Sequence, residues 1–146
     1  MVMSTQILGS INVFIINENK VLLTRRKNTG WMDGYLCPPG GHIEPGESPT
    51  DAALRELKEE LGVDVQKSDL EFLCVAARNT SPNQYVAYEF AVRNKDLTIT
   101  NSEPDKCDEI MWVDMNDLPS DLIPDFGKII ALSILGNTKY LELGFE

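Results

Sequence analysis

Three glutamates crowded into one short segment are the residues of this sequence best suited to chemistry. Glu56, Glu59 and Glu60 stand within RELKEEL, and at about 100° per residue a helix would hold them within an arc of roughly 100°. Carboxylates at this spacing repel one another unless a cation lies among them. Their hard oxygen atoms suit Mg²⁺ or Mn²⁺ better than zinc. A solvated acidic helix face is the alternative that this pattern alone leaves open.

The segment around these glutamates is predicted to form the clearest helix of the chain. Ser48 is a favourable N-cap, and Pro49 suits the first helical position. Gly62 suits the end of the helix. Leucines recur at helical spacing and predict a buried stripe: Leu54, Leu57 and Leu61. Ala52 falls near the middle of the glutamate face, where we expect its small side chain to leave room for a ligand.

Hydrophobic patterns elsewhere predict a sheet and a second helix. Residues 10–16 and 20–26 are expected to form a hairpin, and residues 71–79 and 84–93 two longer strands around a turn. Shorter strands are predicted within 35–41, 96–100 and 110–114, and a helix over 125–135. This order indicates an α/β or α+β class with a mixed β-sheet between helices. We expect one domain spanning residues 1–146.

Composition narrows the partners and the compartment. The net charge of −10 argues against nucleic-acid backbones and anionic membranes as partners. A small polyphosphate remains compatible with it, provided that metal ions bridge the two negative partners. No apolar run approaches the roughly 20 residues of a membrane-spanning helix, and we expect no export signal. The cysteines lack any CxxC pairing, which is typical of free thiols in a reducing cytoplasm: Cys37, Cys74 and Cys107.

The residues around the glutamates carry a resemblance to a known family. Fixed residue types stand at the spacing G-x5-E-x7-R-E-U-x-E-E-x-G-U, where U is aliphatic: Gly41, Glu47, Arg55, Glu56, Leu57, Glu59, Glu60, Gly62 and Val63. This pattern is a complete match to the signature of the Nudix (MutT-like) hydrolases. The resemblance implies a Nudix-type α/β/α sandwich. It also implies attack of water on a phosphorus of a nucleoside diphosphate linked to another group.

The resemblance implies roles for the acidic residues. Glu56, Glu59 and Glu60 would bind the divalent metal together with the carbonyl of Gly40. Glu47 and Arg55 would pair and orient these carboxylates. Some family members take the proton from the attacking water with a helix glutamate, and others with an acidic residue in a later loop. In this chain that loop is NSEPDKCDE, where Glu103 is the leading candidate, for this role or as a further metal ligand, and Glu109 is the second; a plain surface acid is the alternative for each.

Substrate contacts are expected outside the glutamate helix. An arginine that ends the second strand reaches the phosphates in similar proteins, and Arg26 matches that position better than Arg25. Exposed edge charges are the alternative for both. His42 could contact phosphate or hydrogen-bond within its own turn. The segment LIPDF, with Ile123 and Asp125, is expected to touch the base.

Aromatic residues offer further candidates for stacking on a base. Trp31 and Tyr85 are suitable in type, whereas Trp112 lies in an apolar strand and is expected in the core.

The sequence marks that are typical of other Nudix subfamilies are absent here or not at their usual positions. By elimination, the preferred function is a Mg²⁺- or Mn²⁺-dependent nucleoside triphosphate pyrophosphohydrolase that converts (d)NTP to (d)NMP and pyrophosphate. The alternatives are hydrolysis of ADP-ribose or another nucleotide sugar, and a nucleotide-sensing Nudix domain without turnover. RNA decapping is disfavoured because the acidic chain lacks a basic RNA path. We expect a cytoplasmic monomer or homodimer that acts on a small nucleotide, with neither nucleic acid nor a membrane as partner.

Overall fold

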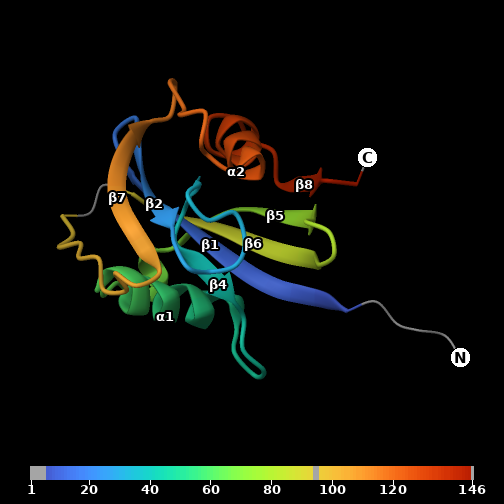
Figure 1. The fold of residues 1–146 in the computed structure, drawn as a ribbon, viewed down its shortest axis with the longest axis horizontal. Coiled ribbons are helices and arrows are strands. Elements are labelled where there is room, and N and C mark those ends of the chain that lie inside the picture. The colour runs from blue at the N-terminus through green and yellow to red at the C-terminus, as the bar shows by residue number, and fades with distance from the viewer. Residues whose placement is uncertain (1–5, 94–95, 146) are drawn as a thin grey trace, which may run out of the picture.

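A computed structural model of the protein describes residues 6–93 and 96–145, and its central feature is one mixed sheet between helices. The strands are β1 (Ile7–Asn17), β2 (Lys20–Arg26), β3 (Leu36–Cys37), β4 (Gly40–His42), β5 (Glu71–Asn79), β6 (Gln84–Arg93), β7 (Cys107–Asp114) and β8 (Tyr140–Leu143). The helical segments are α1 (Pro49–Leu61), η1 (Lys67–Asp69), α2 (Pro124–Ile129) and η2 (Ile130–Ile134). Helices α1 and α2 lie on opposite sides of the sheet (Figure 1), which confirms the predicted fold class.

The sheet is organised around a long parallel pair. Strand β1 pairs with β6 in parallel from Ile7↔Gln84 to Ile16↔Arg93. Strand β2 follows β1 as an antiparallel hairpin but also pairs with β7, and β4 pairs with β1 at Asn12↔Gly40. The order is β3-β2-β1-β6-β5-β8, with β4 on β1 and β7 on β2. The predicted hairpin and the two longer strands are therefore confirmed, and β8 was not predicted.

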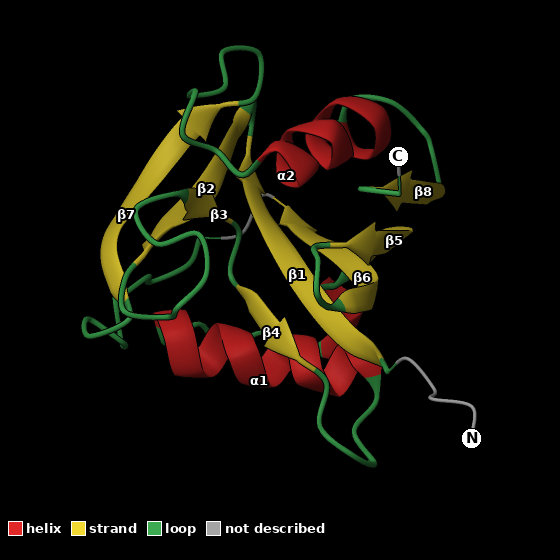
Figure 2. Cartoon of the chain, turned by 45° about the vertical axis from the view of Figure 1, so that its right-hand side comes forward, coloured by secondary structure: helices red, strands yellow, loops and turns green. Residues whose placement is uncertain are grey.

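Alternation along β1 divides the interior into two cores. Ile11, Val13 and Ile15 pack on the α1 side, whereas Phe14 and Ile16 pack on the α2 side. Successive side chains of a strand point to opposite faces, so an uninterrupted apolar run such as this one feeds both cores. Figure 2 shows the sheet between α1 and α2, with β4 beside α1. The same alternation places Ser10 and Asn12 on the α2 side of the sheet.

Helix α1 begins and ends as its sequence predicts. The Ser48 side chain accepts a hydrogen bond from the backbone N–H of Asp51, and Gly62 adopts a left-handed conformation with φ 64° at the C-terminal end. Leu57 and Leu61 are fully buried. The prediction for Ala52 was wrong: this side chain is fully buried in the core against the sheet, because the apolar stripe is wider than the leucines alone.

Two other segments differ from their predictions. Residues 96–100 form no strand; instead the N–H of Thr100 donates to the carbonyl of Leu61 at 2.9 Å, at the end of α1. The predicted helix over 125–135 changes from α to π geometry after Ile129.

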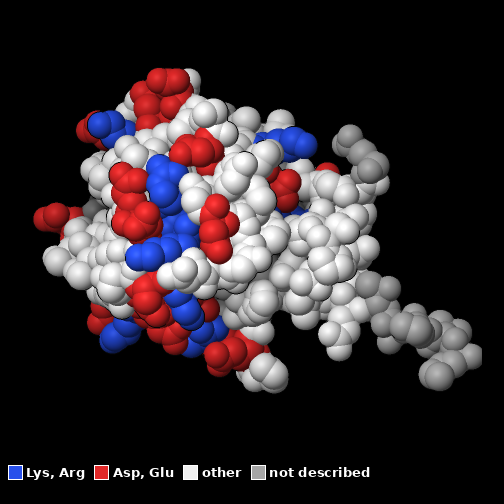
Figure 3. All heavy atoms as spheres, viewed as in Figure 1, with Lys and Arg blue, Asp and Glu red and all other residues white. Residues whose placement is uncertain are grey.

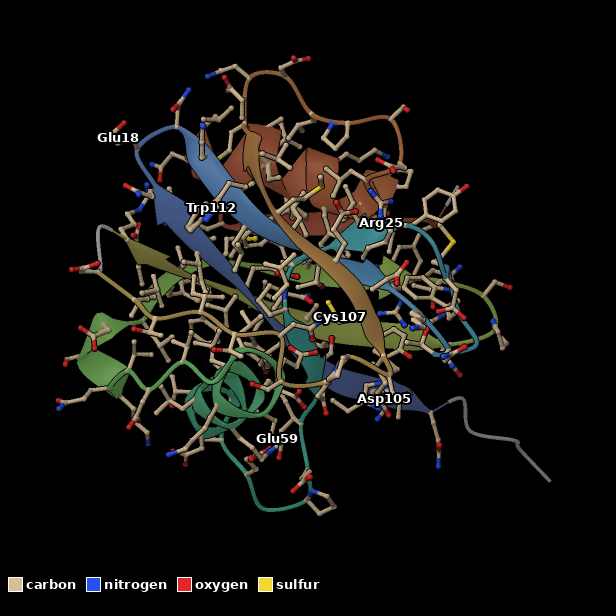
Figure 4. All side chains as sticks on the ribbon, turned by 60° about the vertical axis from the view of Figure 1, so that its left-hand side comes forward. Glu18, Arg25, Glu59, Asp105, Cys107 and Trp112 are labelled. Atoms are coloured by element: carbon tan, nitrogen blue, oxygen red, sulfur yellow. The ribbon has the colours of Figure 1, made fainter. Side chains whose placement is uncertain are left out.

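Trp112, which was expected in the core, is 42% exposed on β7. Figure 4 shows Trp112 and Cys107 toward opposite ends of this strand.

Within the part of the chain that the structure describes, none of the helices has the length and apolar character needed to cross a bilayer.

Candidate active site

A cavity of about 400 Å³ opens where β1, β2 and the end of α1 meet the loops that follow β2 and precede β7. Its wall includes residues that lie far apart in the sequence: Ser10, Asn12, Arg26, Glu60, Arg78 and Glu103. The volume is in the range of small-molecule sites. Of the predicted site residues, the structure thus brings Arg26, His42, Glu60, Glu103 and the Gly40–Gly41 turn to one cavity.

Glu60 is the most enclosed of the helix glutamates. Its carboxylate accepts a hydrogen bond from the backbone N–H of Gly40 at 2.9 Å. Burial raises its pKa to about 8, and the nearby charges of Glu56 and Glu103 add to this effect. A carboxylate held in these surroundings is destabilised when ionised, and a cation bound beside it would relieve that cost.

Arg55 lies at the centre of the acidic cluster. Its guanidinium donates to Glu47 at 2.8 Å and to Glu56 at 2.9 Å, and it reaches Glu59 at 3.3 Å. The hydrogen bond from Arg55 lowers the pKa of Glu47, whereas burial raises the pKa of Glu56. The predicted Glu47–Arg55 pair is therefore present. Figure 3 shows basic and acidic side chains interspersed on the face that carries β7 and α1.

The Gly40–Gly41 turn allows the backbone to approach the glutamates. A Cβ atom at Gly41 would overlap the Glu56 carboxylate, and one at Gly40 would overlap the backbone carbonyl of Ile11 and the Asn12 side chain. Glycine is required here by the lack of space. Because the N–H of Gly40 also holds Glu60, the turn fixes the position of this glutamate relative to the sheet.

The loop that carries Glu103 is attached directly to the end of α1. The N–H of Ser102 donates to the carbonyl of Glu60 at 3.0 Å, and the Asn101 side chain bridges the N–H of Glu103 and the carbonyl of Cys107. The last carbonyls of a helix have no hydrogen-bond partner within the helix. This loop supplies donors to two of them, from the N–H of Ser102 and the N–H of Thr100. Glu103 is thereby held at the cavity next to Glu60.

Arg25 and Arg26 have different surroundings. Arg26 lines the cavity, donates to Thr29 and to the carbonyl of Trp31, and lies 5.0 Å from the centre of the Trp31 ring. Arg25 is absent from the cavity wall, because adjacent strand residues point to opposite faces. Its guanidinium pairs with Glu109 at 3.0 Å and Asp121 at 2.7 Å.

The comparisons with known proteins agree with this geometry. The family model described as NUDIX domain matches residues 8–132. The chain belongs to this Nudix family. Among solved structures, a MutT NUDIX hydrolase from Burkholderia pseudomallei superimposes with a TM-score of 0.78, at 24% identity, over 86% of this chain and 97% of that chain. This likeness concerns the fold.

Curated relatives carry different activities in their names. The RNA pyrophosphohydrolase of Gluconacetobacter diazotrophicus is 28% identical over 123 residues, which are 70% of this chain and 73% of that protein. The 8-oxo-dGTP diphosphatase of Escherichia coli is 38% identical over 61 residues, which are 42% of this chain and 47% of that protein. The match thus spans less than half of the second relative.

The Nudix glutamates fit a divalent cation by their chemistry. No group of three acidic, histidine or cysteine side chains within residues 6–93 and 96–145 is already arranged as a metal-ion cage. The guanidinium of Arg55 lies between Glu56 and Glu59 instead. Yet Glu60 has a raised pKa, a single hydrogen-bond donor and two carboxylate neighbours, and hard oxygen donors of this kind are those that Mg²⁺ binds.

Some of the residues predicted to contact the base lie away from the cavity wall, whereas others line it. Ile123 is a core residue, 3% exposed, and its N–H bonds to the carbonyl of Leu36. Asp125 is not on the cavity wall; its carboxylate accepts from Arg78 at 2.9 Å. His42 lines the cavity and its ring lies 5.6 Å from that of Tyr85, which lines it too. Trp31 is also on the wall.

Sequence reasoning missed a buried polar group on the floor of the cavity. Asn12, Arg78 and Glu89 are 7%, 5% and 0% exposed. Asn12 and Glu89 each interrupt an apolar run within their strand with a polar side chain. A charged or amide residue at a core position of a strand is an informative departure from the pattern, and this signal was available in the sequence at Asn12 and Glu89.

Proposed function

We propose that this chain is a Mg²⁺- or Mn²⁺-dependent nucleoside triphosphate pyrophosphohydrolase that converts (d)NTP to (d)NMP and pyrophosphate. The observation that carries the proposal is that one cavity combines two different surroundings. Glu60 and Glu103 provide acidic oxygens, whereas Asn12 and Arg78 provide a buried polar floor. A nucleotide requires both: carboxylates that would hold the cation needed to neutralise its phosphates, and a sheltered place for its base.

In the proposed enzyme Glu56, Glu59 and Glu60 would hold the metal, with the carbonyl of Gly40 as a further ligand. A divalent cation bound there would supply positive charge to the pyrophosphate and lower the pKa of a bound water molecule. Arg55 keeps Glu56 and Glu59 aligned through its hydrogen bonds at 2.9 and 3.3 Å. Glu47 holds Arg55 from the other side at 2.8 Å.

The residues of the wall would share the remaining tasks. Glu103 accepts the proton of the attacking water, since its loop holds it next to Glu60. Arg26 and His42 contact the phosphates, with Lys106 on the same wall. Glu109, the second candidate for the base, is paired with Arg25 and lies off the wall, which favours Glu103.

The alternative substrates differ in the chemical group that is attached to the phosphates. ADP-ribose or another nucleotide sugar would use the same glutamates, as would an RNA 5′-triphosphate. The net charge of −10, with Arg25 and Arg55 engaged in ion pairs, disfavours an RNA chain. We also propose that residues 1–146 act as one domain in the cytoplasm, as a monomer or homodimer, on small nucleotides rather than on nucleic acid or membranes.

A substrate panel tests the proposal. Purified protein with Mg²⁺ is incubated with the common dNTPs and NTPs, ADP-ribose, and a 5′-triphosphate RNA, and the products are separated by ion exchange. We expect nucleoside monophosphate and pyrophosphate from the triphosphates, and no turnover with EDTA. Preferential cleavage of ADP-ribose or RNA would overturn the substrate assignment, and absence of turnover on the entire panel would favour a sensing domain.

A further inference from the structure

The floor of the cavity is a polar patch on a sheet face that is otherwise apolar. Strand register places it there: Ser10 pairs with Ala87 and Asn12 with Glu89 across β1 and β6, while Ala76 and Arg78 of β5 pair with Ala87 and Tyr85. Residues on one face of neighbouring strands lie side by side. Ser10, Asn12, Glu89 and Arg78 therefore form one group on the α2 side, which we call the polar floor.

Several atoms of the polar floor lack a partner within the described residues. Ser10 Oγ, Arg78 Nη2 and Glu89 Oε2 are buried without a hydrogen bond. Leaving a buried polar atom unpaired destabilises the folded state, and native proteins rarely do so without a reason. Ser10 and Arg78 line the cavity wall, so two of these unpaired atoms belong to residues that a molecule in the cavity would contact.

Two carboxylates, one of them within the polar floor, orient its donors and acceptors. Asp125 accepts from Nε of Arg78 at 2.9 Å, which leaves Nη2 available, and the guanidinium lies 4.8 Å from the centre of the Phe126 ring. Glu89 accepts from Nδ2 of Asn12 at 3.0 Å. With that amide hydrogen engaged, the side-chain oxygen of Asn12 is left as an acceptor.

The charge of the polar floor suits a neutral ring better than a phosphate. Arg78 is compensated by Asp125 in a pair that is largely buried. Burial raises the pKa of Glu89 to about 7, so this carboxyl carries less than a full charge at neutral pH. Phe126 adds a flat apolar wall. The group thus offers directed hydrogen bonds with little net charge.

We propose that Arg78, Asn12 and Ser10 read the edge of the substrate's nucleobase, with Asp125 and Glu89 as positioning residues behind them. This inference rests on the proposed nucleotide substrate. Arg78 donates to a carbonyl oxygen or ring nitrogen of the base, and the Asn12 oxygen accepts from an N–H or amino group. Asp125, expected from the sequence to touch the base, instead holds the arginine that does.

Binding of products tests this inference separately from turnover. The four common dNMPs are titrated by calorimetry into metal-free protein, first the wild type and then the Arg78→Lys and Asn12→Ala variants. A hydrogen bond to a charged group, once lost, weakens binding by roughly 10- to 100-fold. We expect that loss for the preferred dNMP only, so that the four affinities converge. Arg93→Lys is the matched control, because Arg93 pairs with Glu71 on the surface.

The role of the positioning residues must be tested by a measurement that a loss of stability alone would not change. Glu89→Gln is nearly isosteric but can present either a donor or an acceptor to Asn12, so both orientations of the Asn12 amide become possible. We expect the ranking of kcat/KM among the four dNTPs to flatten, through KM more than through kcat. An unchanged ranking in both Arg78→Lys and Asn12→Ala would overturn the proposal.

The outcomes separate the two proposals. Turnover of dNTPs by the wild type with equal losses for every base in the variants would overturn the base-reading role and leave the proposed function standing. Selective dNMP binding without any turnover would support the polar floor and contradict the hydrolase. Absence of dNMP binding by the wild type would contradict the polar floor directly.

Discussion

Glu60 is partly buried and Glu89 fully buried, and within the described residues each accepts one hydrogen bond, yet their surroundings give them different uses. Glu60 accepts from the backbone of Gly40 and has Glu56 and Glu103 as neighbours. Glu89 accepts from the Asn12 side chain and has Arg78 nearby. Burial raises both pKa values, to about 8 and about 7. One carboxylate is crowded by like charge, and the other belongs to a nearly neutral group.

The difference shows that burial alone does not define a role. A carboxylate among carboxylates lowers its energy by binding a cation, and this is the chemistry of a metal site. A carboxylate that faces an amide and a guanidinium lowers its energy by fixing their hydrogen bonds. The predictions below test this contrast, beginning with the largest expected effect.

Glu60→Gln should abolish most of the activity, whereas the same substitution at a surface glutamate should leave the activity unchanged. Loss of a metal ligand or general base lowers kcat by roughly 10²- to 10⁴-fold. The measurement is Mg²⁺-dependent dNTP hydrolysis at saturating substrate. Glu142→Gln serves as the control, since that glutamate is exposed and accepts a hydrogen bond from Tyr140. Near-normal kcat in Glu60→Gln would remove Glu60 from the proposed metal site.

Glu103→Gln should lower kcat by a similar factor for every base, on the order of 10- to 100-fold. The chemistry at phosphorus is common to all nucleotides, and Glu103 lies on the wall next to Glu60. Asp125→Ala should instead change the ranking of the bases, because it frees Arg78. Values of kcat/KM for the four dNTPs with each variant decide between these roles, and a reordered ranking in Glu103→Gln would reverse the assignment.

The stability of the metal-free protein should fall as the pH rises. Glu60 has a folded-state pKa of about 8 against a reference value of 4.5, so the folded state binds its proton more tightly than the unfolded chain. Its stabilising contribution is complete below pH 4.5 and is lost as the pH rises through 8. At pH 8.5 we expect the free energy of unfolding of Glu60→Gln to exceed that of the wild type by on the order of a few kcal/mol. Urea denaturation measures this difference.

Two comparisons sharpen that experiment. Mg²⁺ should stabilise the wild type at pH 8.5 more than the Glu60→Gln variant, because a bound cation compensates the same charge. Glu89→Gln should flatten the pH dependence over the lower window that ends near its folded pKa of about 7. If the wild type were equally stable at pH 5 and pH 8.5, neither carboxylate would be destabilised by burial.

Arg25→Gln should have the smallest effect. Its ion pairs with Glu109 and Asp121 are partly exposed, and such pairs contribute about 1 kcal/mol or less each. We expect a small decrease in the free energy of unfolding and unchanged kcat/KM. Arg26→Gln, by contrast, should raise KM for every dNTP, because Arg26 lines the cavity. A large loss of activity in Arg25→Gln would contradict this separation of neighbouring arginines.

The sequence by itself determined the local features, because their causes lie within a few residues. The caps at Ser48 and Gly62 and the leucines of α1 depend on contacts three or four positions apart. The hairpin of β1 and β2 depends on a short turn. The three glutamates and the Nudix signature around them could be read in the same way, since one helix carries the whole glutamate set.

The tertiary structure alone decided which of these side chains face the cavity. Whether Arg25 or Arg26 lines it, and whether Asp125 or Arg78 does, depends on strand faces and on how the segment before α2 packs. The polar floor joins Asn12 to Glu89, which lie 77 positions apart in the chain. Such pairs follow from the register of β1 against β6, and a shift of one residue would turn every side chain to the other face.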